Sequence, residues 1–221
     1  MKKFSLIIVS LLLTACAPIS STNIETPIVE IITDDTTQPV IKTVVPPEDS
    51  IVLEWGADNM DRGRYDYYWG EKKIVVTLDY SQMNRGDVIY FQTPEFEHDF
   101  DLQKNSLSRI VGLPGETIEI KNGQVFIDNK KFIAFYSQAL NRGLTGEEYF
   151  EEVSPVNRVN DDPWKEYFAT DMNPVKVTDN TVFVLGDNWW RSVDSRDFGP
   201  ISKESIVGKV LGYEKKYTST P

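Results

Sequence analysis

The chain has 221 residues, of which 40% are hydrophobic and 26% charged, and this composition suits one domain of ordinary size. Its formal net charge of −11 argues against nucleic acid as a partner and against attachment to an anionic membrane through basic residues. The single cysteine, Cys16, excludes a disulfide within the chain and a cysteine-based metal site, and we expect no cofactor.

Residues 1–15 have the pattern of a secretory signal peptide. Two lysines precede an apolar run, residues 4–13, that is too short to span a bilayer as a stable helix. The sequence LTAC at 13–16 is similar to the lipobox of bacterial lipoproteins, in which the cysteine is lipidated and becomes the mature N-terminus. The resemblance implies a bacterial lipoprotein that Cys16 anchors to the extracytoplasmic face of a membrane. The alternative is an ordinary cleaved signal peptide.

Residues 16–50 are rich in Ser, Thr, Pro, Ile and Val and contain no aromatic residue. We expect the lipidated cysteine to be followed by a flexible, extended tether. The alternative is that residues 28–33 or 40–45 add an edge strand to the domain. Aromatic residues become frequent from Ile51, so we expect the folded domain over 51–213 and a frayed tail over 214–221.

Short apolar and β-branched runs along the domain predict strands. These runs are residues 74–78, 88–91, 117–120, 124–127, 182–185 and 206–213. Asn122-Gly123, between two of the runs, is a strong signal for a hairpin turn. Residues 137–176 show few clean periods, and there we expect one short helix near 162–168. The many short strands indicate a mostly β fold with little helix.

The most informative stretch is VFVLGDNWWRSVDSRDFGP at 182–200, a buried strand that leads into a polar loop. One interpretation is structural, because Asp and Ser are common in turns, where their side chains bond local backbone groups. However, GDNWWRSVDSRDFG at 186–199 is similar to the GDN-x-x-x-S-x-DSR-x-x-G segment of type I signal peptidases. These are membrane-bound serine proteases that cut signal peptides from exported proteins. The arginine common after GDN in that family is replaced here by Trp189.

Two further segments resemble the same family in the same order. They are RGDVIYF at 85–91 and RIVGLPGE at 109–116. The chain is therefore identified as a divergent member of the family over roughly residues 54–213. The resemblance implies an antiparallel, barrel-like β architecture in which 137–176 is a variable insertion.

The resemblance also implies which residues build the site. The supporting positions of the family motifs fall on Asp87, Arg109, Asp187, Asn188, Ser192, Asp194, Ser195 and Arg196. The family's catalytic pair is a serine nucleophile and a lysine base. In this chain Asn59 occupies the serine position and Ser108 the lysine position. An asparagine has no acidic proton to lose and a serine is no base near neutral pH, so no intact catalytic pair is expected. The supporting residues would then have a structural role, as an Asp-Arg pair and a hydroxyl that join the loop to the core.

Substitutes for the missing pair are few. Lys104 precedes Ser108 by four residues, about 13 Å along a strand, which is too far to replace the lysine directly. Ser106 and Ser108 are nucleophiles by type, but nothing supplies their base. His98 lies in an acidic stretch and is most simply a solvated loop residue; as a metal ligand it would lack a second nitrogen or sulfur partner.

The sequence therefore predicts an exported, lipid-anchored, catalytically inactive homologue of the signal peptidases. It would bind peptides or exported proteins, or assist an active signal peptidase, with the membrane as a further partner through Cys16. One alternative is an active serine endopeptidase with a rearranged catalytic site, and another is a structural surface lipoprotein. The aromatic and apolar residues around 55–69 fit a binding surface and a core equally well.

Overall fold

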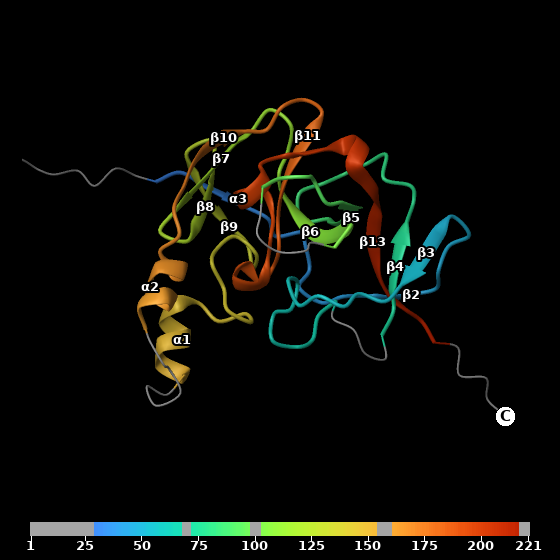
Figure 1. Cartoon of the computed structure of the whole chain (residues 1–221), viewed down its shortest axis with the longest axis horizontal. Coiled ribbons are helices and arrows are strands. Elements are labelled where there is room, and N and C mark those ends of the chain that lie inside the picture. Colours follow the sequence, from blue (N-terminus) through green and yellow to red (C-terminus); the bar gives the residue numbers. More distant parts are fainter. Residues whose placement is uncertain (1–28, 68–71, 98–102, 154–160, 217–221) are drawn as a thin grey trace, which may run out of the picture.

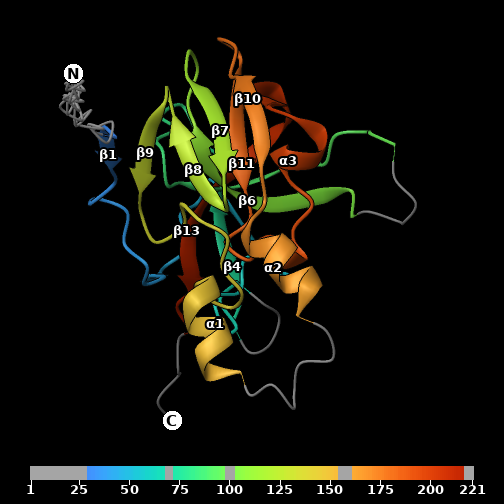
Figure 2. The same cartoon turned by 90° about the vertical axis from the view of Figure 1, so that its left-hand side faces the viewer.

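The computed structural model describes residues 29–67, 72–97, 103–153 and 161–216. Across these residues the chain forms two β-sheets and three short helices (Figures 1 and 2). Eight strands form the larger sheet: β2 (Thr43–Val44), β3 (Ser50–Leu53), β4 (Ile74–Thr77), β5 (Val88–Gln92), β6 (Asn105–Gly112), β11 (Thr181–Leu185), β12 (Ile201–Ser202) and β13 (Ile206–Glu214). Five form the smaller sheet: β1 (Ile31–Thr33), β7 (Thr117–Lys121), β8 (Gln124–Ile127), β9 (Lys130–Ile133) and β10 (Met172–Lys176).

The larger sheet follows the order β12-β11-β6-β5-β13-β4-β3, and neighbouring strands along this path are antiparallel. The nine-residue strand β13 pairs with β5 near its start and with β4 near its end. The runs predicted as strands correspond to β4, β5, β7, β8, β11 and β13. The expected mostly β, antiparallel fold is confirmed.

The smaller sheet contains the predicted hairpin. Strands β7 and β8 pair antiparallel across Asn122 and Gly123, whose φ angles of 48° and 72° both lie in the left-handed region. Only a few residue types adopt that conformation readily, and Asn-Gly is the preferred pair in such turns. The inward side chains of the hairpin, Ile118, Ile120, Val125 and Ile127, are all buried.

One apolar cluster joins the two sheets. The inward side chains of the β7–β8 hairpin pack with Val111 of β6 and with Phe183 and Leu185 of β11. Full burial of such side chains stabilises a fold by about 1.5–3 kcal/mol each. This packing fixes the end of β11, and the loop after it, against the smaller sheet.

The helices are short. The predicted helix near 162–168 is confirmed as α2 (Asp162–Phe168). Helix α1 (Gly146–Glu152) was not predicted, although Thr145 and Glu148 form a reciprocal capping box that the sequence T-x-x-E signals. Figure 2 shows α1 and α2 side by side at one end of the molecule, where Tyr149 of α1 packs on Trp164 of α2 with ring centres 4.8 Å apart. The one-turn helix α3 (Ser195–Phe198) follows β11.

Residues 29–50 differ from the flexible tether expected over 16–50. β1 pairs in parallel with β9, and β2 pairs in parallel with the end of β13. Ile32 packs against the core, and the Asp34 carboxylate accepts a hydrogen bond of 2.5 Å from the Tyr136 hydroxyl. The prediction of a flexible tether is therefore wrong for residues 29–50, and the alternative prediction of added edge strands is correct. A local pattern does not reveal these strands, because Ile31 pairs with Lys131, which is far along the chain.

Three sequence predictions fall wholly or partly outside the described residues. Cys16, with the signal peptide, lies there, as does His98. The tail expected over 214–221 is described only to residue 216, and Glu214 is the last residue of β13. Within the part of the chain that the structure describes, no helix combines the length and the apolar character that a bilayer crossing requires.

Candidate functional site

The loop after β11 lies directly against the main chain of residue 59. Asn188 N donates to the Asn59 carbonyl oxygen at 2.9 Å, and Ser192 Oγ donates to the same oxygen at 3.1 Å. A Cβ atom at position 186 would lie 1.8 Å from Ser192 Oγ and 2.7 Å from that carbonyl oxygen. Glycine at 186 is therefore required for the loop to approach residue 59.

The DSR part of the motif caps and anchors α3. The Asp194 carboxylate is fully buried and accepts hydrogen bonds from Gly186 N at 3.0 Å and Arg196 Nε at 2.8 Å. Arg196 also donates to the Trp189 carbonyl at 2.9 Å, and Ser195 Oγ accepts from Val184 N of β11 at 2.9 Å. These bonds tie the loop to the strand before it.

Arg109 and Asp187 form a buried ion pair beside this loop. Arg109 Nε and Nη2 donate to the two Asp187 carboxylate oxygens at 2.7 and 2.5 Å, and Nη1 donates to the Gly86 carbonyl at 2.7 Å. Burial alone would lower the pKa of the Arg109 guanidinium, but the Asp187 carboxylate more than offsets this and holds the pKa above its usual range. Arg62 Nε lies 3.4 Å from Asp187 Oδ2 and adds a second positive charge.

Asn59 and Ser108, the two residues expected at the catalytic positions, converge on one atom. Asn59 Nδ2 donates to the Leu107 carbonyl oxygen at 2.7 Å, and Ser108 Oγ donates to the same oxygen at 2.7 Å. The structure thus joins Asn59 to Leu107 of β6, 48 positions away in the sequence, and brings Asn59 close to Ser108. Asn59 is 7% exposed and Ser108 is fully buried.

Trp55 packs beside the same place. Its indole Nε1 donates to Asn59 Oδ1 at 3.2 Å, and its ring meets that of Tyr90 edge-on at 6.3 Å. Trp55, Met60 and Tyr67 are all buried. These three residues therefore belong to the core and not to an exposed binding surface. Tyr65 is 72% exposed.

Neither alternative nucleophile in β6 has a base beside it among the described residues. Ser106 Oγ shares a hydrogen bond of 3.1 Å with Thr93 Oγ1. Lys104 is exposed, and its carbonyl oxygen accepts from Thr93 N at 3.0 Å. Ser108 Oγ is bonded to the main chain rather than to an amine, so its proton has no acceptor that could activate it.

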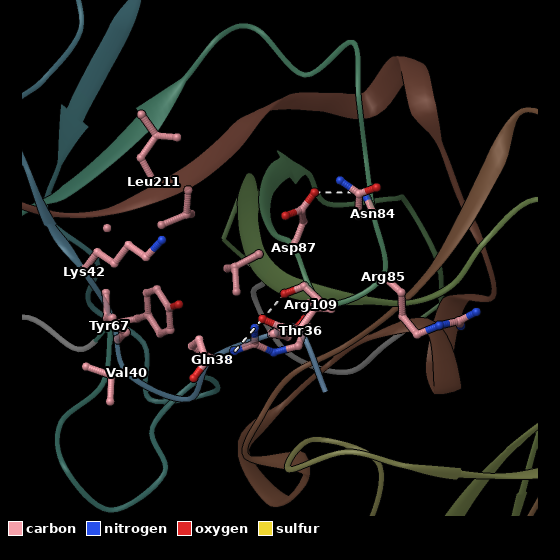
Figure 3. Close-up of a pocket in the computed structure, with 16 residues that line it drawn as sticks. Thr36, Gln38, Val40, Lys42, Tyr67, Asn84, Arg85, Asp87, Arg109 and Leu211 are labelled. Carbon is pink, nitrogen blue, oxygen red and sulfur yellow. Dashed lines mark hydrogen bonds between the residues drawn. The ribbon is translucent and has the colours of Figure 1, made fainter. Parts of the chain in front are cut away.

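Asp87 belongs to a different surface. Its carboxylate accepts from Asn84 N at 2.9 Å and lies 3.4 Å from Lys209 Nζ, in the turn before β5. With Lys42 and Tyr67 it lines a polar pocket of about 350 Å³, which Figure 3 shows around the Arg109 side chain. Residues 36–42 form one wall of this pocket, so the segment expected as a tether contributes to it.

A second pocket, of about 560 Å³, was not anticipated from the sequence. Loop residues Asp58 and Asn188 line it together with Trp164 of α2 and Trp190. The tryptophans at 164 and 190 are visible in the sequence, but no local pattern indicates that they meet. Their ring centres lie 4.4 Å apart.

Comparison with known proteins connects this geometry to a family. Residues 64–213, more than half of the chain, match the family described as "Signal peptidase, peptidase S26". The matched range contains Ser108 and the GDN and DSR segments, whereas Asn59 lies five residues before its start, so the match does not include the expected serine position.

Individual relatives are similar over most of the same region. The chain is 32% identical to "Signal peptidase I S" of Bacillus subtilis (strain 168) over 137 residues, which cover 61% of each chain. It is 29% identical to "Probable signal peptidase I-1" of a Synechocystis species over 146 residues, covering 64% of this chain and 61% of that protein. The chain thus spans about three fifths of the length of these curated relatives.

A solved structure is similar as well. The crystal structure of a signal peptidase I from Enterococcus faecalis V583 is 25% identical to this chain, with a TM-score of 0.40. The match covers 58% of this chain and 97% of that one.

Proposed function

The chain belongs to the S26 family of signal peptidases, and from this membership we propose that it is an exported, lipid-anchored member that binds extended polypeptides without cleaving them. The single observation that carries the proposal is the shared acceptor of Asn59 and Ser108, the Leu107 carbonyl oxygen. A catalytic pair needs a nucleophile whose proton passes to a base. Here both side chains donate to the main chain, and neither can accept a proton from the other near neutral pH.

Binding does not need the lost pair, because an extended chain can add to a free strand edge through main-chain hydrogen bonds. β5 pairs with β6 along Asn105–Arg109, whereas β11 pairs only with Arg109, Ile110 and Gly112. Within the described residues, the first half of β6 therefore has a strand neighbour on one side only. This half of the strand ends at Ser108, one of the vacated positions.

The direction of the main-chain groups supports the same edge. In antiparallel pairs, alternate residues turn their N–H and C=O groups toward and away from the partner strand. The Lys104 carbonyl accepts from Thr93 N on the β5 side, so the groups of Asn105 and Leu107 point away from β5. Asn59 and Ser108 already donate to the Leu107 carbonyl, and Leu107 is buried, so half-buried Asn105 is the position open to an added strand. The bond from Asn59 to the Leu107 carbonyl agrees with this alternation. The partner would be an exported polypeptide, either free or held by an active signal peptidase.

The first test asks about cleavage, using purified full-length protein in detergent and a fluorogenic peptide with a small-x-small site. We expect no cleavage by the native protein and measurable cleavage by the double variant Asn59→Ser with Ser108→Lys. The matched control is Asn59→Ser with Ser106→Lys, which adds the same two residue types but puts the lysine elsewhere on β6. Cleavage by the native protein that a serine-directed acylating inhibitor abolishes would contradict the proposal and favour the active-protease alternative.

The second arm measures binding of the same peptide by fluorescence anisotropy. Asn105→Pro removes an outward N–H without touching the ladder to β5, so we expect binding to weaken by about threefold to tenfold, the worth of one hydrogen bond. Asn105→Ala keeps the N–H and should bind like the native protein. If the native protein neither binds nor cleaves the peptide, the alternative of a structural surface lipoprotein is the better one.

A further inference from the structure

The second pocket adjoins the vacated catalytic positions. Its lining includes Asp58 and Asn188, and Asn188 N donates to the carbonyl oxygen of Asn59 at 2.9 Å. The opposite wall comes from α1, α2 and the loop at 141–144. Figures 1 and 2 show the two helices together at the end of the molecule below the smaller sheet. The variable insertion therefore builds a pocket next to the proposed peptide-binding edge.

Aromatic rings form one wall of the pocket. Trp164 lies between Tyr149, with ring centres 4.8 Å apart, and Trp190, with ring centres 4.4 Å apart. The planes are tilted by only 38° and 35°, so the rings are layered on one another. A cage for a cation would need ring faces directed at one centre, and this arrangement lacks that geometry. Trp190 is 46% exposed, and exposed tryptophan is typical of a surface that takes an apolar group.

The polar part of the pocket lacks one hydrogen bond. Asn188 is 2% exposed, and its Nδ2 donates to the Asp58 carbonyl at 3.2 Å, while its Oδ1 has no partner within the described residues. Nearly all buried acceptors in native proteins are paired. Arg191 Nε lies 2.9 Å from an Asp58 carboxylate oxygen, and Arg142, which also lines the pocket, is exposed. This unpaired acceptor is itself buried, so the part of the pocket most open to a ligand is the exposed ring of Trp190.

We propose that this pocket binds a large apolar side chain, aromatic by preference, of the same extended polypeptide. The assignment rests on the proposed function, since that polypeptide is the one that lies along β6. An extended chain that lies along β6 could place one of its side chains on the exposed ring of Trp190. The pocket would therefore select polypeptides by a bulky residue near the small-x-small segment.

The test compares two peptides that differ at one position, using full-length protein in detergent. Both carry the small-x-small segment, and one has Phe where the other has Ala a few residues away; the position of the Phe is scanned along the peptide. We expect the best Phe peptide to bind about tenfold more tightly than its Ala partner, from the apolar area that the ring buries. Trp190→Ala should remove this advantage, and Trp190→Phe should restore most of it. Tyr65→Ala, which removes another exposed ring, is the matched control and should leave the advantage unchanged.

A small probe, N-acetyl-phenylalanine amide, tests the pocket separately from the strand edge. It carries one aromatic ring but no extended chain that could pair with β6. If this probe binds in a Trp190-dependent manner while neither peptide binds, the pocket assignment stands and the strand-edge binding falls. If both peptides bind equally at every Phe position and Trp190→Ala changes nothing, the pocket assignment is wrong and the strand-edge binding stands. Absence of binding by the probe and by both peptides would overturn the pocket assignment as well.

Discussion

At the scale of single residues, the Arg109–Asp187 pair holds the loop after β11 against β6. Both side chains are almost fully buried, and two hydrogen bonds join them. A buried charge that loses its partner is strongly destabilising, because water cannot take the partner's place. We expect Asp187→Ala to lower the free energy of unfolding by about 3–5 kcal/mol, measured by urea denaturation at neutral pH.

The control for this change is an exposed pair. Glu54 and Lys73 lie 3.9 Å apart, with side chains 69% and 48% exposed. Pairs of this kind contribute about 0–1 kcal/mol, so Glu54→Ala should change the unfolding free energy little. Equal effects of the two substitutions would mean that the Arg109–Asp187 pair does not stabilise the loop.

Sequence patterns identified the residues of this pair, but of the residues that line the second pocket they identified only Asn188. Arg109 and Asp187 lie in segments whose register short motifs fix, so their meeting could be expected from the resemblance. Asn188 also lies in such a segment, but its unpaired Oδ1 depends on the position of every neighbour in three dimensions. The contact between Trp164 and Trp190 likewise joins the irregular region 137–176 to a position that the GDN motif leaves unspecified. Packing between distant residues leaves no local signature.

At the scale of elements, the segment after β1 is fastened by the Asp34 carboxylate. Thr36 N, Thr37 N and the Tyr136 hydroxyl donate to it, and the Tyr136 ring lies 5.1 Å from the Arg109 guanidinium. Partial burial would raise the pKa of Asp34, but the hydrogen bonds from Thr37, Tyr136 and Thr36 outweigh it and hold the pKa well below its usual range. The ionised form is therefore favoured by folding.

The sign of the pH dependence follows from this lowered pKa. Asp34 contributes stability that is present above its unfolded pKa of about 4 and is lost as the pH falls toward its folded value. We expect Asp34→Asn to be less stable than the native protein at pH 7, with the difference shrinking as the pH is lowered below about 4. Asp35→Asn is the matched control, because Asp35 is exposed and receives a hydrogen bond from Thr33 Oγ1 instead. A difference between native protein and Asp34→Asn that stays constant down to pH 2 would contradict this account. Urea denaturation at each pH gives the measurement.

The elements that sequence reasoning found are those whose signals are local. The β7–β8 hairpin could be predicted because Asn122-Gly123 and two alternating runs lie within eleven residues, from Thr117 to Ile127. β1 and β2 could not be predicted with the same certainty, since each is short and forms only by pairing with a distant strand. Proline-rich composition around them favoured a tether. Helix α1 could have been predicted, because the sequence T-x-x-E at its start signals a capping box.

At the scale of the whole molecule, membrane attachment and peptide binding must be compatible. The described residues begin at residue 29, and β1 starts at Ile31. Fifteen residues separate Ile31 from Cys16, a span of at most about 50 Å when fully extended. A lipidated Cys16 would therefore keep the domain close to the membrane, where exported polypeptides emerge. The net charge of −11 gives the protein no affinity of its own for an anionic surface.

Membrane attachment is therefore expected to depend on Cys16 alone. Expressed in a bacterium with its signal peptide intact, the native protein should incorporate an alkyne-labelled fatty acid and sediment with membranes. Cys16→Ser should abolish labelling and move most of the protein to the soluble exported fraction, because no other lipid anchor is proposed and an acidic domain is repelled by anionic lipid.

The soluble variant should bind the small-x-small peptide as the native protein does, since the β6 edge is far from the substitution in sequence and does not use the lipid. Retention of the variant on membranes would mean that the domain surface itself binds lipid or a membrane protein, and an active signal peptidase would then be the first partner to test by co-purification.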